Sequence, residues 1–173
     1  MTVLTTQRLT LRPVEPGDFA ALCPIWSDKD FLRGIGLPPL TPETVWFRLL
    51  RDIGHWQVYG HGNWAVVHDG AFIGTVGIFD YRRDMEPPLD TMEAGWGLTP
   101  AVHGKGFALE ALTAILHHAD TVLNLPETVC IIASDNAPSL KLAEKVGYVD
   151  GGEVSYRGER ILLLRRANGQ DAQ

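Results

Sequence analysis

Cysteine is scarce in this chain, which contains only Cys23 and Cys130 among its 173 residues. The two lie far apart and have no metal-ligand spacing, so we expect neither a disulfide framework nor a metal site. Cys130 stands in the apolar run 129–133, which predicts a buried thiol. This cysteine usage favours a reducing compartment, and we expect the protein to be cytoplasmic.

The chain also lacks an excess of positive charge and any long apolar run. Its 15 basic and 21 acidic residues give a net charge of −6, which argues against nucleic acid as the main partner. No window reaches the roughly 18 apolar residues of a membrane span, and residues 1–8 do not resemble a signal peptide. We therefore expect no membrane partner. The length predicts a single domain over residues 1–173, with a flexible tail from about residue 167.

The most informative segment present is a glycine loop between a strand and a helix. The segment Trp96-Gly-Leu-Thr-Pro100 favours a strand that ends at a proline, and a long apolar helical pattern starts at Phe107. Between them, Gly104 and Gly106 let the backbone approach a ligand closely, because neither carries a Cβ atom. Free N–H groups at such a junction, with the positive end of a helix dipole behind them, form a site for phosphate or pyrophosphate.

Spacing argues against two other chemistries. A P-loop phosphotransferase requires the pattern G-x-x-x-x-G-K-[ST], whereas Lys105 is followed by Gly106. The adjacent His117 and His118 have no third ligand at a useful spacing, so we interpret them as a solvated pair rather than a metal site.

Strand and helix patterns follow one another in the order β-αα-βββ-α-β-α-ββ. The pair Asp69-Gly70 between two apolar segments predicts a hairpin whose turn has positive φ angles. This order differs from the strict alternation of a doubly wound nucleotide fold. We expect a mixed α/β (α+β) fold with one mostly antiparallel, twisted sheet of about seven strands and helices on both faces. The expected strands are 8–13, 64–68, 71–79, 92–98, 128–133, 148–154 and 156–164.

At this point the chain resembles the GNAT superfamily of acetyl-CoA-dependent N-acetyltransferases. The element order is similar across essentially the whole chain, and His103-Gly-Lys-Gly-Phe-Ala108 resembles the family's pyrophosphate loop, Q/R-x-x-G-x-G/A. Four segments are similar to the branch named for ribosomal-protein-alanine N-acetyltransferases (RimJ/RimL-like): 8–13, 62–64, 93–96 and 104–111. The resemblance implies a single GNAT-type domain whose strands 4 and 5 splay apart. It also implies acetyl transfer from acetyl-CoA to a primary amine by direct attack in a ternary complex.

The resemblance also assigns the contacts with acetyl-CoA. The backbones of Trp96 and Leu98 are expected to pair with the pantetheine arm, unless the strands are fully paired and these residues belong to an ordinary sheet. Asn136 and Ser139 stand in a segment similar to the second cofactor-contact helix, although Asn136 also suits a helix entry. The pyrophosphate is expected at His103, Gly104, Lys105, Gly106, Phe107 and Ala108.

Two members of that loop have alternative interpretations. His103 stands where the family has Gln or Arg, and it can be a turn residue without ligand contact. Lys105 can be a solvated lysine at a helix start. Because the loop binds mainly through backbone N–H groups, we expect the departure at residue 103 to matter little.

Acetyl transfer needs a base for the ammonium and a donor for the thioester oxygen, and it benefits from an acid for the thiolate. Glu93 is the candidate base, because it stands three residues before Trp96 in a mostly apolar setting that suits a base near neutral pH. Its alternatives are a surface carboxylate or an ion-pair partner. Ser139 is a candidate acid, beside a water molecule or no specific acid. Many relatives use a tyrosine at the position that Ala143 occupies here.

The missing tyrosine keeps a second hypothesis open, a non-catalytic acyl-CoA-binding or regulatory module on the same fold. The amine acceptor is also open among peptide N-termini, polyamines, amino acids and aminoglycoside-like drugs. Loops 33–40 and 81–91, with Tyr156 and Arg157, are expected to wall its pocket. Four acidic residues would favour polycations if they face that pocket, or form a solvated loop face: Asp80, Asp84, Glu86 and Asp90. We expect a monomer or a homodimer.

Overall fold

The computed structural model describes residues 2–33 and 35–169 of the chain. Within these residues, nine strands form one sheet in the order β1-β2-β3-β4-β6-β7-β9-β8-β5. All neighbouring strands are antiparallel except β6 and β7. The strands are β1 (Leu4–Thr5), β2 (Thr10–Pro13), β3 (Asn63–His68), β4 (Ala71–Phe79), β5 (Met85–Glu86), β6 (Met92–Leu98), β7 (Glu127–Ile132), β8 (Val149–Tyr156) and β9 (Glu159–Ala167).

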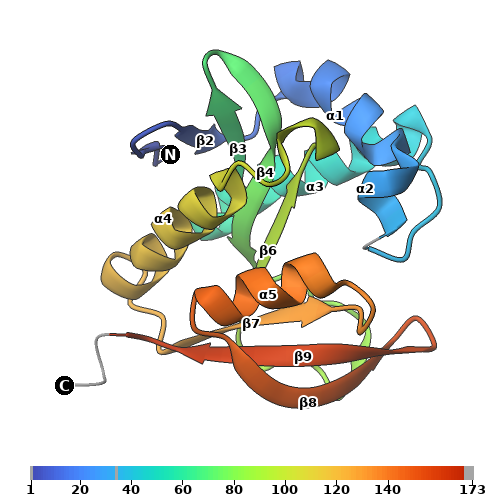
Figure 1. Ribbon diagram of the computed structural model, residues 1–173, viewed down its shortest axis with the longest axis vertical. Helices are drawn as coiled ribbons and strands as arrows, with labels where there is room; N and C mark the ends of the chain where they lie inside the picture. The colour runs from blue at the N-terminus through green and yellow to red at the C-terminus, as the bar shows by residue number, and fades with distance from the viewer. Residues whose placement is uncertain (1, 34, 170–173) are drawn as a thin grey trace.

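Five α-helices accompany the sheet in the described part of the chain: α1 (Phe19–Ser27), α2 (Lys29–Arg33), α3 (Pro42–Tyr59), α4 (Phe107–Thr121) and α5 (Ala137–Lys145). Figure 1 shows α4 and α5 in front of the sheet and α3 passing behind it. The start of α3 follows from its sequence, because Thr41 accepts a hydrogen bond from the Thr44 N–H and Pro42 occupies the first turn. The main core lies between these helices and the sheet, and it contains Leu11, Leu49, Trp64, Ile78, Leu112 and Ile115.

The expected fold class is confirmed, and the seven expected strands correspond to β2, β3, β4, β6, β7, β8 and β9. The turn between β3 and β4 has φ angles of 49° at Asp69 and 78° at Gly70, as the hairpin signal predicts. The strand count of about seven is two too low, because β1 and β5 have only two residues each. Strands that short carry no alternating pattern, so only pairing with a neighbour defines them.

Two local expectations need correction. The tail expected from about residue 167 begins too early, because Ala167 ends β9 and the buried Asn168 side chain donates to the carbonyl oxygens of Asp120 and Leu125. Residues 170–173 of that tail lie outside the described residues. His118 is not part of a solvated pair, because its ring is buried and packs edge-on against Trp64. Adjacent positions on a helix face different directions, so His117 is exposed while His118 faces the core.

Within residues 2–33 and 35–169, no helix combines the length and apolar character that crossing a membrane requires. The same residues contain no group of three or more His, Cys, Asp or Glu side chains placed to hold a metal ion.

Candidate active site

The two parallel strands β6 and β7 separate soon after they begin to pair. Their register contains only Met92 opposite Thr128 and Glu93 opposite Val129. Beyond that point β6 stays paired with β4 up to Leu98, and β7 stays paired with β9 up to Ile132. Figure 1 shows the two strands diverging at a wide angle. Edge groups of both strands therefore face the gap without a strand partner there, as the splayed-strand expectation requires.

A cavity of about 860 Å³ lies at this opening. From the strands it is lined by residues 93–97 of β6 and by 130–132 of β7, and from the start of α5 by Asn136 and Ser139. The expected acceptor loops also reach it, through residues 35–37 and through Tyr81 and Arg83. Tyr156 and Arg157 complete this side. A cavity of this volume can hold a small ligand or part of a larger one.

The glycine loop lies at the start of α4, as its sequence predicts. Gly104 and Gly106 have φ angles of 75° and 81°, the left-handed region that favours glycine. Gly106 is the N-cap of α4 and, being glycine, has no side chain to satisfy the first N–H groups of the helix. These N–H groups and the helix dipole therefore favour an anion at this position.

The His103 side chain is held by a contact with the end of β6. Its Nε2 lies 2.9 Å from the Leu98 carbonyl oxygen, and its backbone N–H donates to the Pro100 carbonyl oxygen. The available N–H groups of the loop therefore begin after His103. Its contact with a ligand stays a prediction, and the structure gives it a role in holding the loop against the end of β6.

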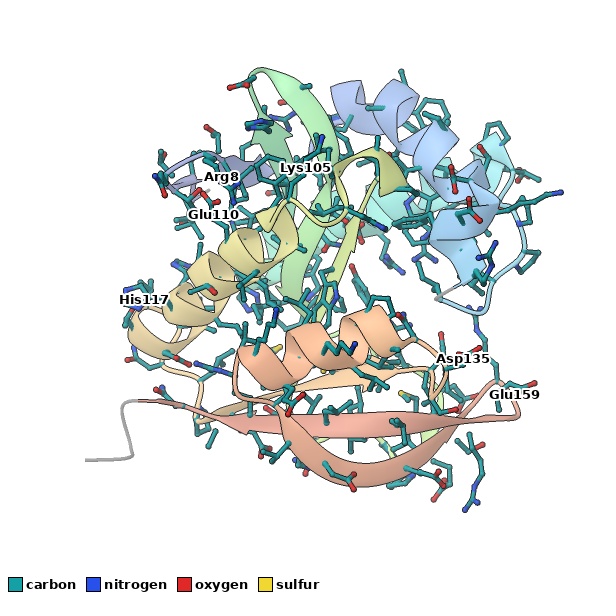
Figure 2. All side chains as sticks on the ribbon, viewed as in Figure 1. Arg8, Lys105, Glu110, His117, Asp135 and Glu159 are labelled. Atoms are coloured by element: carbon teal, nitrogen blue, oxygen red, sulfur yellow. The ribbon has the colours of Figure 1, made fainter. Side chains whose placement is uncertain are left out.

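Arg8 braces the same loop from the other end of the chain, a contact that the sequence did not predict. Its Nη1 donates to the Lys105 carbonyl oxygen at 2.9 Å, and its Nε pairs with Glu110 at 2.6 Å. The guanidinium also lies over the Phe107 ring, 4.4 Å from its centroid. Figure 2 shows Arg8, Lys105 and Glu110 gathered at the beginning of α4. Arg8 thereby fixes the loop to the first turn of the helix.

We expect the substitution Arg8→Ala to weaken the binding of acetyl-CoA roughly tenfold, a free-energy change of about 1.4 kcal/mol. The reason is lost preorganisation of the loop, since one residue holds both Lys105 and Glu110. Titration calorimetry with acetyl-CoA measures the effect, and Lys29→Ala on the exposed surface of α2 is the control. An unchanged dissociation constant for Arg8→Ala would show that the loop keeps its shape without the brace.

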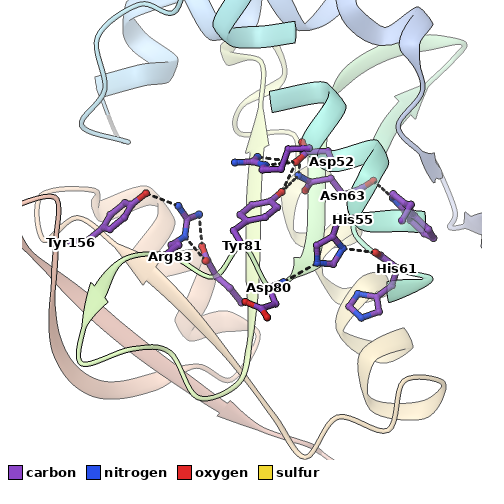
Figure 3. Close-up of polar contacts among 11 residues, drawn as sticks. Asp52, His55, His61, Asn63, Asp80, Tyr81, Arg83 and Tyr156 are labelled. Carbon is purple, nitrogen blue, oxygen red and sulfur yellow. Dashed lines mark hydrogen bonds and ion pairs between the residues drawn. The ribbon is translucent and has the colours of Figure 1, made fainter. Parts of the chain in front are cut away.

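Glu93 is buried and paired with an arginine from the loop after β4. Its two carboxylate oxygens accept from Arg83 Nε at 2.6 Å and from Arg83 Nη2 at 3.0 Å. The third nitrogen of Arg83 donates to the Tyr156 hydroxyl at 3.0 Å, as Figure 3 shows. Burial alone would lower the pKa of Arg83, but Glu93, together with Tyr156, outweighs burial and raises it. The ion-pair alternative for Glu93 is therefore present in the structure, and its role as a base stays a prediction.

The start of α5 places Asn136 and Ser139 at the cavity. Asn136 is the N-cap of the helix, and its Oδ1 accepts a hydrogen bond from the Ser139 backbone N–H at 3.2 Å. The helix-entry role is thus observed, and a ligand contact for either residue stays a prediction. Ala143, at the position of the tyrosine, is fully buried in the main core.

A polar network on the side of the cavity that Tyr81 and Arg83 line is built around Asp52, which the sequence did not single out. Asp52 Oδ1 accepts from Arg51 and from the Tyr81 hydroxyl at 2.7 Å, and Oδ2 accepts from Asn63 Nδ2 at 3.0 Å. Figure 3 shows Asp52, Asn63 and Tyr81 meeting beside the Arg83 pair. Burial first, and then the Asp52 charge, raise the pKa of Tyr81, so its hydroxyl stays protonated and donates. The sequence signal that could have indicated this network is the spacing of Arg48, Arg51 and Asp52, which places them on one face of a helix.

The acidic residues around 80–90 do not line the cavity. Asp80 accepts from the Tyr59 hydroxyl, and Asp90 pairs with Arg165. Asp84, Glu86 and Asp90 are exposed, so these three form the solvated loop face that was one of the two alternatives. The ionisable side chains that line the cavity include five arginines: Arg48, Arg51, Arg83, Arg157 and Arg160.

Known proteins are similar to this chain in sequence and in architecture. Residues 8–149 match the family described as the acetyltransferase (GNAT) domain. The uncharacterized N-acetyltransferase p20 of Bacillus licheniformis is 29% identical over 155 residues, which cover 88% of this chain and 85% of the relative. A solved structure of a GNAT-family protein from Bordetella pertussis is 34% identical, with a TM-score of 0.85 over 96% of this chain and 100% of that chain.

The fold is also that of RimL, a ribosomal L7/L12 α-N-protein acetyltransferase solved in complex with coenzyme A. That structure has a TM-score of 0.78 over 96% of this chain and 98% of its own, at 15% identity. At such an identity the likeness concerns the fold alone. The structural neighbours of this chain thus include a member of the RimL branch.

Proposed function

Because this chain belongs to the GNAT acetyltransferase family, we propose that it transfers the acetyl group of acetyl-CoA to a primary amine. The observation that carries the proposal is the separation of β6 and β7 after two residue pairs, with a cavity at the opening and a left-handed glycine loop beyond the end of β6. A thioester with a long, polar arm and a pyrophosphate matches that combination of features.

In this proposal, acetyl-CoA lies along the free edge of β6. The pyrophosphate is held by the N–H groups of the loop that includes Gly104, Lys105, Gly106, Phe107 and Ala108. The amides of the pantetheine arm pair with the backbone of Trp96 and Leu98, and Asn136 and Ser139 approach it from α5. The acetyl group then reaches the cavity near Glu93, and the amine enters between residues 35–37 and the loop that carries Tyr81 and Arg83.

The proposed reaction is a direct displacement. The amine nitrogen forms a bond to the thioester carbon, the carbon–sulfur bond breaks, and coenzyme A leaves as a thiolate that takes up a proton. Before the attack, Glu93 takes a proton from the acceptor ammonium, directly or through a water molecule, so that the nitrogen lone pair becomes available. Each of its oxygens keeps a second lone pair while Arg83 is bound, so a position for the proton remains beside the ion pair. Ser139 is the proposed proton donor to the thiolate, and a water molecule is the alternative donor.

The test measures acetyl-CoA binding and thiol release separately. Titration calorimetry with acetyl-CoA is followed by a thiol-release assay against peptides that start with Ala or Ser, spermidine, free amino acids and aminoglycosides. We expect binding, and thiol release that depends on one class of amine. Absence of binding would contradict the proposal as a whole. Binding without release would favour the second candidate, a non-catalytic acyl-CoA-binding module. The presence of Ala143 where many relatives have a tyrosine supports that candidate.

A further inference from the structure

Arg48 is an arginine of the cavity that forms no ion pair within the described residues. It comes from α3, and its guanidinium lies over the Trp26 ring, 4.0 Å from the centroid. Its Nε is buried and has no hydrogen-bond partner in residues 2–33 and 35–169. A buried guanidinium nitrogen without an acceptor is costly, because water has been removed and nothing replaces it.

Among the described residues, none of the four carboxylates that line the cavity forms an ion pair with Arg48, and other groups already bind two of them. Asp52, one turn along α3, accepts from Arg51, Tyr81 and Asn63. Both oxygens of Glu93 accept from Arg83. These two carboxylates therefore neutralise Arg51 and Arg83, and the charge of Arg48 is left over. Burial first, and then repulsion from Arg51, lower the pKa of Arg48 to about 10, so it is still a cation at neutral pH.

We propose that the acceptor amine also carries a carboxylate, and that Arg48 binds this carboxylate. The inference rests on the proposed function and names its acceptor class. The acceptors are free amino acids and compounds closely related to them, not polyamines. A planar, forked guanidinium matches a carboxylate by two parallel hydrogen bonds. The cavity of about 860 Å³ must also hold the acetyl end of acetyl-CoA, which favours a small acceptor. Trp26, Phe31 and Leu37 on the same wall provide an apolar contact for its side chain.

Matched pairs of acceptors test the role of the carboxylate. Each common amino acid is compared with its carboxamide, which keeps the amine and the side chain but loses the negative charge. The carboxamide has the more acidic ammonium, so a preference for the free acid cannot come from easier deprotonation. We expect kcat/KM to be at least about tenfold higher for the free acids and spermidine to be a poor acceptor.

Three variants assign the preference to Arg48. In Arg48→Met, which keeps an unbranched apolar side chain, we expect the acid-to-amide ratio to fall to about one, because the charge that would bind the carboxylate is lost. In Arg48→Lys the acid-to-amide ratio should lie between those of the parent and Arg48→Met, since the positive charge remains but the forked guanidinium is lost. Arg82→Met is the matched control. It removes the same charge from an exposed residue that does not line the cavity.

The outcomes separate this inference from the proposed function. Turnover of amides or spermidine at least as fast as of the free acids, or an unchanged ratio in Arg48→Met, would overturn the inference and leave the acetyltransferase proposal intact. Calorimetry with N-acetyl amino acids and their amides in the presence of coenzyme A needs no turnover. Tighter binding of the acid that is lost in Arg48→Met supports the assignment even if no transfer is found, and equal binding of acid and amide overturns it.

Discussion

Replacement of Glu93 by Gln is expected to lower kcat about 100- to 10,000-fold, the range over which a positioned acid–base group contributes. The introduced amide would keep the size of the side chain and a hydrogen bond to Arg83, but it could not accept a proton. The dissociation constant for acetyl-CoA should not change, because the proposed contacts with the pyrophosphate and pantetheine lie elsewhere. Steady-state thiol release and calorimetry measure the two quantities on the same preparation.

The matched control for this prediction is Glu127→Gln. Glu127 is also a carboxylate paired with an arginine, Arg165, but it lies at the start of β7 and away from the cavity. Its replacement should leave kcat within about twofold of the parent, because a partly exposed ion pair contributes little. If Glu93→Gln kept the parent kcat, Glu93 would be a structural ion-pair residue, and the proton would leave through water alone.

Local patterns predicted those parts of the site that depend on neighbouring residues. The glycine loop is an example. Glycine is favoured where the backbone is left-handed, and Gly104 and Gly106 have that conformation before α4. The Asp69-Gly70 turn is another, because its φ angles follow from residue type. The separation of β6 and β7 has no such local signal. It depends on how each strand pairs on its other edge, and only the family resemblance implied it.

Arg8, Arg48 and Arg51 escaped prediction, because the partner of Arg8 is distant in sequence and the other two lie on a helix whose buried face is ambiguous. Arg8 meets Glu110 across 102 positions, and no pattern near Arg8 indicates that contact. On α3 the apolar residues occupy more than one face, and Phe47 and Leu50 turn out to be exposed while Arg48 and Asp52 border the cavity. Which face of an amphipathic helix is buried depends on packing that the helix sequence alone does not determine.

The second large effect concerns folding stability, and it arises at the Arg83–Glu93 pair. The side chains of Arg83 and Glu93 are only 19% and 6% exposed, so each needs the other after losing its water. We expect Arg83→Met to lower the free energy of unfolding by about 3 kcal/mol, because it leaves the Glu93 carboxylate buried without a counter-charge. Urea denaturation at pH 7, with equal slopes for parent and variant, measures this change.

The double variant Arg83→Met with Glu93→Gln distinguishes the loss of charge pairing from a simple loss of packing. Because no unpaired ion is buried in the double variant, its loss of stability should be about 2 kcal/mol smaller than the sum of the losses in the two single variants. Additive effects would mean that water screens the pair. A screened carboxylate would be open to bulk solvent at the base of the cavity, and Glu93 would then lack the dry setting that favours a catalytic base.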